Sequence, residues 1–117
     1  MNREELLAEK ILQLDWLYSV TQNLSNKAKI LAEMIELARK AGIEVISDED
    51  LEKLLTHVFA SSLAYDNPAL QANALITINK LKSDLIAKCI EANLIKRYQY
   101  SGGNLDGSKQ ITLNSGN

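Results

Sequence analysis

The chain contains few of the residues that cross-link a fold or bind metal. Its 117 residues include one cysteine, Cys89, and one histidine, His57. A single cysteine cannot form an internal disulfide, and these two side chains alone do not make the ligand set of a structural zinc site. The sequence therefore predicts a fold without disulfides, without a metal ion and without a cofactor.

Long apolar runs are also missing. No segment approaches the roughly 18 uninterrupted apolar residues of a membrane span, and residues 1–5 do not have the basic and then apolar order of a secretory signal. We therefore expect a cytoplasmic protein with no membrane partner. At 117 residues the chain is one domain, or a small domain with a tail, and it can bury a core of its own.

The single proline, Pro68, begins the most regular apolar pattern in the chain. Pro68 suits the first turn of a helix, and Asp66 or Asn67 can cap that turn. A helix over Asn67–Ile95 would be about 40 Å long, which is too long for so small a domain to cover by itself. We therefore expect a homo-oligomer in which a second copy covers the apolar stripe. The predicted interface residues are Leu70, Ala74, Ile78, Leu81, Leu85 and Cys89.

Two further stripes of helical spacing lie in the N-terminal third. The first consists of Leu6, Leu7, Ile11, Leu14, Leu17 and Tyr18, and the second of Ala28, Leu31, Met34, Ile35 and Ala38. Asn23–Asn26 is rich in residues that cap helices and make turns but has no Gly or Pro, so residues 3–40 form either one very long helix or two. Gly42 stands where a left-handed residue commonly ends a helix.

A third helix is predicted from Ser47, which is the expected N-cap, to about Ala64. The connection to Pro68 is short, so this helix and the long one should form an antiparallel hairpin. After Ile95, the strand-like segments 97–100 and 110–113 flank a turn-rich loop, which indicates a β-hairpin. The fold class is therefore mainly α, with three or four helices and a C-terminal β-hairpin, divided at 1–46, 47–96 and 97–117.

No catalytic residues are predicted. His57 is expected to be a partly exposed helix residue, and Cys89 to be buried and inert. The acids Asp48, Glu49 and Asp50 occupy consecutive helical positions, which point about 100° apart and cannot converge on one ion. Trp16 and Tyr18 are expected to pack in the core or in a subunit interface, although an exposed stacking surface is the alternative.

The charges are unevenly distributed along the chain. Residues 1–79 carry a net charge of −5 and residues 80–117 a net charge of +3, so the C-terminal third is the basic part. Cations and aromatic side chains on a helix and a hairpin can follow a phosphate backbone, but solubilising lysines would give the same pattern. The candidate nucleic-acid-binding residues are Lys80, Lys82, Lys88, Lys96, Arg97, Tyr98, Tyr100 and Lys109.

The C-terminal quarter resembles winged-helix regulators of the multiple-antibiotic-resistance type. Glu91–Arg97 is similar to the end of their recognition helix, with Asn93 in place of the usual Gly, and Asp106-Gly107 followed by Gln110–Leu113 is similar to their wing. The resemblance implies a dimer that places the helix from Lys80 to Glu91 in the major groove, with a turn at Thr77–Asn79.

The order of parts resembles a second family, the small subunits of tailed-phage terminases. A helical N-terminal region, an antiparallel hairpin with a long second helix and a short C-terminal β segment occur in that family, and Asp66–Leu70 is similar to its hairpin turn. The resemblance implies a ring-shaped oligomer that binds double-stranded DNA and presents viral DNA to a packaging motor subunit. It leads to the prediction of a non-catalytic DNA-binding oligomer. The alternatives are a winged-helix regulator and a helical structural adaptor without a nucleic acid partner.

Overall fold

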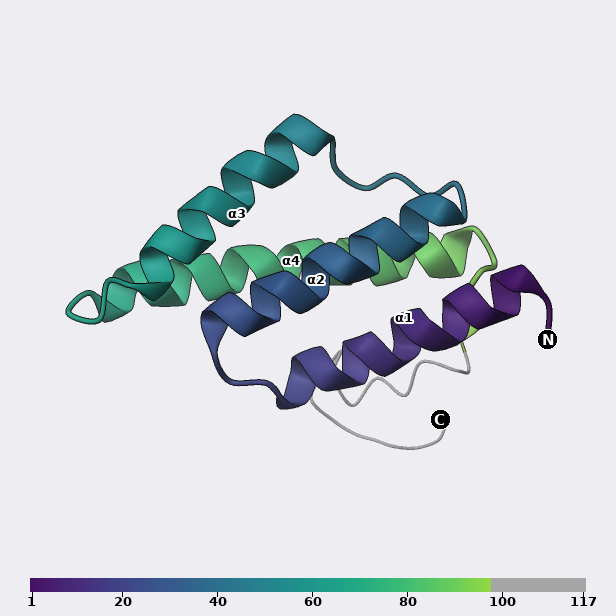
Figure 1. The fold of residues 1–117 in the computed structure, drawn as a ribbon, viewed down its shortest axis with the longest axis horizontal. Coiled ribbons are helices and arrows are strands. Elements are labelled where there is room, and N and C mark those ends of the chain that lie inside the picture. The colour runs from purple at the N-terminus through teal and green to yellow at the C-terminus, as the bar shows by residue number, and fades with distance from the viewer. Residues whose placement is uncertain (98–117) are drawn as a thin grey trace.

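The computed structural model describes residues 1–97 of the chain, and these residues form four helices. The helices are α1 (Arg3–Val20), α2 (Leu24–Lys40), α3 (Asp48–Ser62) and α4 (Pro68–Glu91) (Figure 1). The prediction of a mainly helical fold is confirmed for this part of the chain. The predicted β-hairpin falls almost entirely on residues 98–117, outside the described residues.

Side chains that accept hydrogen bonds from free backbone amides begin the helices. Asn2 and Glu5 form a reciprocal capping box at α1. The predicted caps of α3 and α4 are confirmed, since Ser47 accepts from the amide of Asp50 and Asn67 from the amide of Leu70, each at 3.1 Å. These contacts satisfy donors that have no partner inside the helix.

Residues 3–40 form two separate helices and not one very long helix. Thr21 is extended, with φ −84° and ψ 131°, and ends α1. Asn23 then caps α2 by accepting from the amide of Asn26 at 2.9 Å. Asn23 therefore replaces the glycine or proline that usually marks such a break, because its side chain stabilises the new helix start.

Two residues with a positive φ angle lie just after the C-terminal ends of helices. Gly42 has φ +82°, which confirms its predicted left-handed conformation after α2. Asn93 has φ 63° and stands just after the end of α4 at Glu91. The long helix is therefore four residues shorter than the predicted span to Ile95. Ile95 is nevertheless fully buried, because the chain turns back onto the core.

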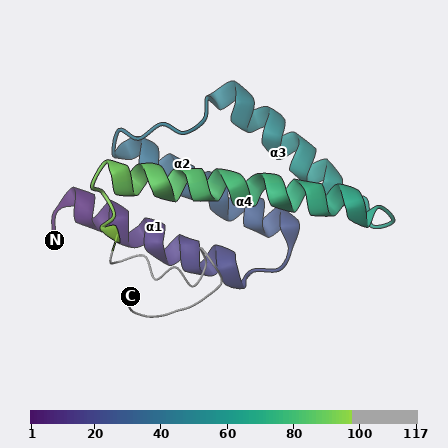
Figure 2. The same cartoon turned by 180° about the vertical axis from the view of Figure 1, so that it is seen from behind.

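The helices α1, α2 and α4 lie along one another, and α2 packs against each of the other three helices (Figure 1). The predicted antiparallel hairpin of α3 and α4 is present. The two helices meet at the connection between them, and α3 then diverges from α4, as the reverse view also shows (Figure 2). One hydrophobic cluster includes residues from all four helices, so both halves of the described chain share a single core.

The apolar stripe of α4 lies inside this core. Ala74, Ile78, Leu85 and Cys89 are completely buried within the single chain, and Leu70 and Leu81 are half-buried. The expectation that a second copy must cover these six residues is therefore corrected. They are covered by the chain's own helices, because α2 and α3 pack against α4 and side chains of α1 reach it at Lys82 and Asn79.

The two N-terminal aromatic residues have different environments. Tyr18 is buried, as expected, with 2% of its surface exposed. Trp16 is 62% exposed in the single chain, so it does not pack in the core, and its packing in a subunit interface stays a prediction. The residues are two positions apart on α1 and point about 200° apart around the helix axis, so they cannot both face the core.

Candidate interaction surface

Of the eight predicted nucleic-acid-binding residues, five lie in the described part of the chain, and four of these five are exposed. Lys80 is exposed and pairs with Asp84, with 3.5 Å between nitrogen and oxygen. Lys88 donates a hydrogen bond to the backbone carbonyl of Glu44 at 3.2 Å. Lys96 and Arg97 are exposed just beyond α4. Tyr98, Tyr100 and Lys109 lie outside the described residues.

Lys82 is not available to a phosphate, and its assignment to a DNA contact is corrected. Its ammonium group lies 2.5 Å from a carboxylate oxygen of Asp15, and the two side chains are 7% and 4% exposed. Lys82 occupies the buried stripe of α4, four residues after Ile78, and Asp15 stands four residues after the buried Ile11 on α1. The ion pair therefore fastens α1 to α4 inside the core.

Further polar contacts surround this ion pair. The Tyr18 hydroxyl donates to Asn79 Oδ1 at 2.6 Å. Lys27 donates to the Tyr18 carbonyl at 2.7 Å and lies 4.1 Å from the centre of the Tyr18 ring. Burial raises the pKa of Tyr18, and the Asp15 charge raises it further. Burial also lowers the pKa of Lys27, with a smaller contribution from the Lys82 charge.

This polar cluster holds helices together and is closed to substrates. Asp15 and Lys82 are too buried for an external molecule to reach them, and their charges are directed at each other. Cys89 is also fully buried, and burial raises the pKa of its thiol to about 11, so it stays protonated at neutral pH. The predicted inert state of Cys89 agrees with this environment. His57 is exposed on α3.

Residues 1–97 contain neither a metal-binding cluster nor a membrane-spanning helix. No group of three or more His, Cys, Asp or Glu side chains in this range is placed to hold a metal ion. Within the same range, no helix has the length and apolar character needed to cross a membrane.

Helix α1 carries apolar side chains on two opposite faces. Leu7, Ile11 and Tyr18 face the core. On the opposite side four large apolar side chains contact water, and their exposed fractions are 45% for Leu6, 62% for Trp16, 41% for Leu17 and 52% for Val20. We call these four residues the outer face of α1. An exposed apolar patch of this kind commonly marks an interaction site.

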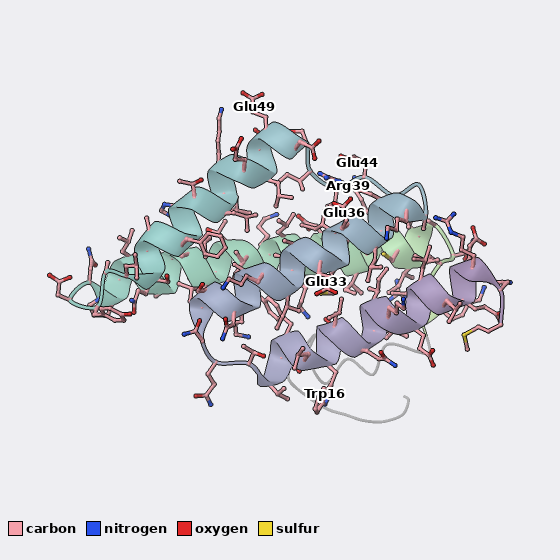
Figure 3. The ribbon with its side chains drawn as sticks, in the orientation of Figure 1. Trp16, Glu33, Glu36, Arg39, Glu44 and Glu49 are labelled. Atoms are coloured by element: carbon pink, nitrogen blue, oxygen red, sulfur yellow. The ribbon has the colours of Figure 1, made fainter. Side chains whose placement is uncertain are left out.

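A groove between α1 and α2 adjoins the outer face. Its volume is about 990 Å³, and apolar side chains of Leu12, Leu14 and Leu37 lie along it. Trp16 and Leu17 belong to both the groove and the outer face. The charged lining residues are Glu9, Lys10, Glu33, Glu36 and Lys40. Figure 3 shows Glu33 between the two helices and Trp16 pointing away from them.

A charge cluster fixes the neighbouring end of α2. The Arg39 guanidinium contacts Asp48 at 2.5 Å, Glu44 at 3.5 Å and Glu36 at 3.7 Å, and it donates to the carbonyl of Ile46 at 2.8 Å (Figure 3). One side chain thus joins the last turn of α2 to the loop and to the start of α3. This cluster keeps the α2 side of the groove in place.

The outer face could have been recognised from spacing alone. The predicted α1 stripe contained both Leu6 and Leu7, and both Leu17 and Tyr18, although adjacent helical residues point about 100° apart. Such a stripe is too wide for one contact and indicates two apolar faces. Comparison of the chain with protein-family models, with curated proteins and with solved structures finds no match in any of the three. Its function is therefore inferred from its own surfaces.

Proposed function

We propose that this chain is a non-catalytic helical interaction protein that binds an apolar helix of a protein partner on the outer face of α1. The observation that carries the proposal is the exposure of Leu6, Trp16, Leu17 and Val20 on a helix whose other face is already packed. This function corresponds to the adaptor alternative, without a nucleic acid partner.

The exposed side chains of the outer face supply part of the energy that a specific contact needs. Full burial of a large apolar side chain contributes about 1.5–3 kcal/mol, so covering the exposed half of four such side chains contributes on the order of 3–6 kcal/mol before association entropy is subtracted. A partner helix lying beside α1 would also reach the groove, where Leu12, Leu14 and Leu37 offer further apolar contact. The charged residues of the groove can then fix its orientation.

Panning of a displayed library of helical peptides tests the proposal. Peptides with an apolar face should be enriched on the natural chain and should lose binding at least tenfold when Leu17→Glu places a charge in the contact. Ser83→Glu is the matched control, because Ser83 is exposed on α4 and away from the outer face. If no enriched peptide distinguishes the Leu17→Glu variant from the control, the outer face is not a binding surface.

A DNA-binding oligomer of the terminase type is the second candidate. It is favoured by the cations at the C-terminal end of α4, where Lys88 and Arg97 line one hollow together with Glu91, and Lys96 is exposed nearby. A few weak phosphate contacts in each subunit would be multiplied in a symmetric assembly. The winged-helix alternative has no comparable support, because Thr77–Asn79 lies within the unbroken helix α4.

Retention of duplex DNA at low salt separates the two candidates. The DNA-binding candidate requires retention that falls when Lys88, Lys96 and Arg97 are all changed to Gln. The control changes Arg3, Lys29 and Lys53, which are also exposed and carry the same total charge. Absence of retention, or equal loss in both triple variants, removes the second candidate.

A further inference from the structure

We infer that the C-terminal segment of the chain covers one side of the outer face of α1, with Tyr98 and Tyr100 packed against Trp16. Both tyrosines lie outside the described residues, and the place where the described chain ends directs them to this surface. A partner helix must displace the segment to reach Trp16. The contact itself is independent of the proposed function, whereas its effect on a partner rests on that function.

The described chain ends beside α1. After the turn at Asn93, Ile95 is fully buried, which fixes the path of the backbone one residue before Lys96. Lys96 lines a hollow of about 530 Å³ whose other wall is the first half of α1. Figure 2 shows the chain running from the end of α4 toward this half of α1. The residues that follow Arg97 therefore start next to α1.

Charges of opposite sign line this hollow. Lys96 lies on one wall, and three carboxylate side chains lie on the other, which are Glu4, Glu5 and Glu9. Their attraction favours a path of the chain along α1. Because these groups are exposed, water and salt weaken the attraction, so it directs the segment without holding it. The contact with α1 must therefore come from apolar side chains further along the segment.

One side of α1 leads from this hollow to Trp16. Four residues follow one another at steps of four, three and four positions, and they are Glu5, Glu9, Leu12 and Trp16. Side chains at this spacing lie on one side of a helix. The first three line the hollow beside Lys96, and Trp16 lies one helical turn beyond Leu12. Figure 3 shows Trp16 pointing away from α2, so the indole is open on the side where the described chain ends.

The segment after Arg97 is long enough to reach the indole. Glu9 and Trp16 are seven positions apart, which corresponds to about 10 Å along the helix axis. A residue spans at most about 3.3–3.6 Å of extended chain, so the first few residues after Arg97 cover this length. Tyr98 and Tyr100 are the first and the third of these residues. Their rings are therefore the first large apolar groups that can meet Trp16.

Aromatic side chains suit a contact at the edge of a helix. Trp16 is 62% exposed among residues that are otherwise polar or charged on this side of α1. Aromatic rings pack against one another in offset or edge-to-face arrangements, and the hydroxyl of a tyrosine can stay in water at the rim. A two-stranded hairpin such as the one predicted after Ile95 is also marginal by itself and needs a surface to pack against. Trp16 and Leu12 offer that surface.

The connection to the fold favours this segment over a separate molecule. A segment joined by a short linker is present at an effective concentration in the millimolar range. A free partner at micromolar concentration displaces it only when the partner makes a much stronger contact. The segment therefore shields Trp16 while no partner is bound and sets a threshold for weak partners.

The fluorescence of Trp16, the single tryptophan, tests the contact in the full chain. In the double variant Tyr98→Ser/Tyr100→Ser, the emission should move to longer wavelength and acrylamide should quench it at least twofold more strongly. The values for the natural chain should not change from low micromolar to hundreds of micromolar, because the contact lies within one chain. Tyr65→Ser removes an exposed tyrosine at the connection between α3 and α4 and should leave both values unchanged.

Proton NMR of the natural chain identifies the two sides of the contact. Nuclear Overhauser effects should connect the Trp16 indole with the ring protons of Tyr98 or Tyr100. Equal quenching in the natural chain and the double variant, without such effects, overturns the inference. Shielding of Trp16 that grows with protein concentration shows that a second copy covers the indole and also overturns it.

Peptide binding separates this inference from the proposed function. A helical peptide selected on the outer face should bind the double variant at least threefold more tightly than the natural chain, and equal affinities would overturn the competition. If Trp16 is shielded by the tyrosines but no peptide discriminates Leu17→Glu, the contact stands and the proposed function fails. If Trp16 is unshielded but peptides discriminate Leu17→Glu, the contact fails and the proposed function stands.

Discussion

Asp15 and Lys82 are the two charged residues that the fold buries within residues 1–97. Taking two charges out of water costs several kcal/mol for each ion, and their attraction repays this only with good geometry and further hydrogen bonds. The 2.5 Å contact between them meets the first requirement. The pair therefore specifies how α1 meets α4 more than it adds net stability.

Removing one member of the Asp15–Lys82 pair should lower the free energy of unfolding much more than removing both. Lys82→Met leaves the Asp15 carboxylate buried without its cation, and a loss of about 3–5 kcal/mol in the free energy of unfolding is expected. The double variant Asp15→Leu/Lys82→Met should recover most of this loss. Urea unfolding measures all three values. Lys80→Met is the control for an exposed pair and should cost below about 1 kcal/mol. A double variant as unstable as the single one would contradict this account.

Cys89 should make stability fall at alkaline pH. Its thiol pKa rises from 9.0 to about 11 on folding, so between these values the folded state binds more protons than the unfolded state. Stability from this group is therefore full below pH 9 and declines as the pH rises toward 11. The expected loss is about 2–3 kcal/mol.

Urea unfolding at a series of pH values measures the Cys89 effect. The Cys89→Ala variant should show a shallower decline than the natural chain between pH 9 and 11. Tyr18 provides the background, because its raised pKa makes stability fall in both proteins above pH 10. If the free energy of unfolding declined equally with pH in the two proteins, the Cys89 thiol would not be the cause of the decline.

The burial and the contacts of individual side chains were harder to predict from the sequence than the helices. Lys82 and Asp15 look like surface residues because charges are rarely buried, and only their position on apolar stripes reveals their pairing. The pairing joins residues 67 apart in the chain, so no local pattern could show it. Trp16 is the reverse case, because a large aromatic residue is usually assigned to a buried position and this one is exposed in the single chain.

At the scale of the helices, Asn93 controls the end of α4. Its φ of 63° is costly for residues with a Cβ atom, and Asn tolerates it better than most. Asn93→Ala should therefore lower stability by about 1 kcal/mol. Asn93→Gly should be at least as stable as the natural chain. Asn73→Ala, at an exposed position inside α4, should be neutral or slightly stabilising because alanine favours helix. Thermal unfolding compares the three, and a neutral Asn93→Ala would exclude strain at this position.

Helix boundaries could largely be predicted from the sequence because their causes are local. Ser47, Asn67 and Gly42 act through amides and dihedral angles within four residues of themselves. The end of α4 was placed too late because Ile95 is apolar and buried like a helix residue. Its burial comes from the turn at Asn93, which is a tertiary effect.

At the scale of the whole molecule, the core accounts for the apolar stripe of α4. A helix over Asn67–Ile95 was expected to be too long for one small chain to cover, but α4 ends at Glu91, and α2 and α3 both pack against it. The apolar stripe of one helix, taken alone, does not show how the other helices are arranged around it. Large apolar side chains that stay exposed include the outer face of α1 and, away from it, Leu63, Tyr65 and Ile76.

Stability should also be unequal across the molecule. Val58 and Ser61 are the buried residues of α3, whereas α2 has five and α4 six. Amide hydrogens of α3 should therefore exchange faster with solvent than those of α2 and α4, through local opening that leaves the other helices folded. Exchange measured by mass spectrometry or NMR tests this order. Equal protection in α3 and α4 would mean that the hairpin opens as one unit.

The contact between Asp15 and Lys82 also sets an order of events during synthesis. A chain that emerges from the ribosome N-terminus first presents α1 long before Lys82 exists, so the carboxylate of Asp15 must stay hydrated until more than half of α4 has been made. Closing a loop of 67 residues is slow compared with forming the nearby contacts of Arg39. The contact between Asp15 and Lys82 should therefore form late in folding, after α1 has packed against α2, its neighbour in the chain.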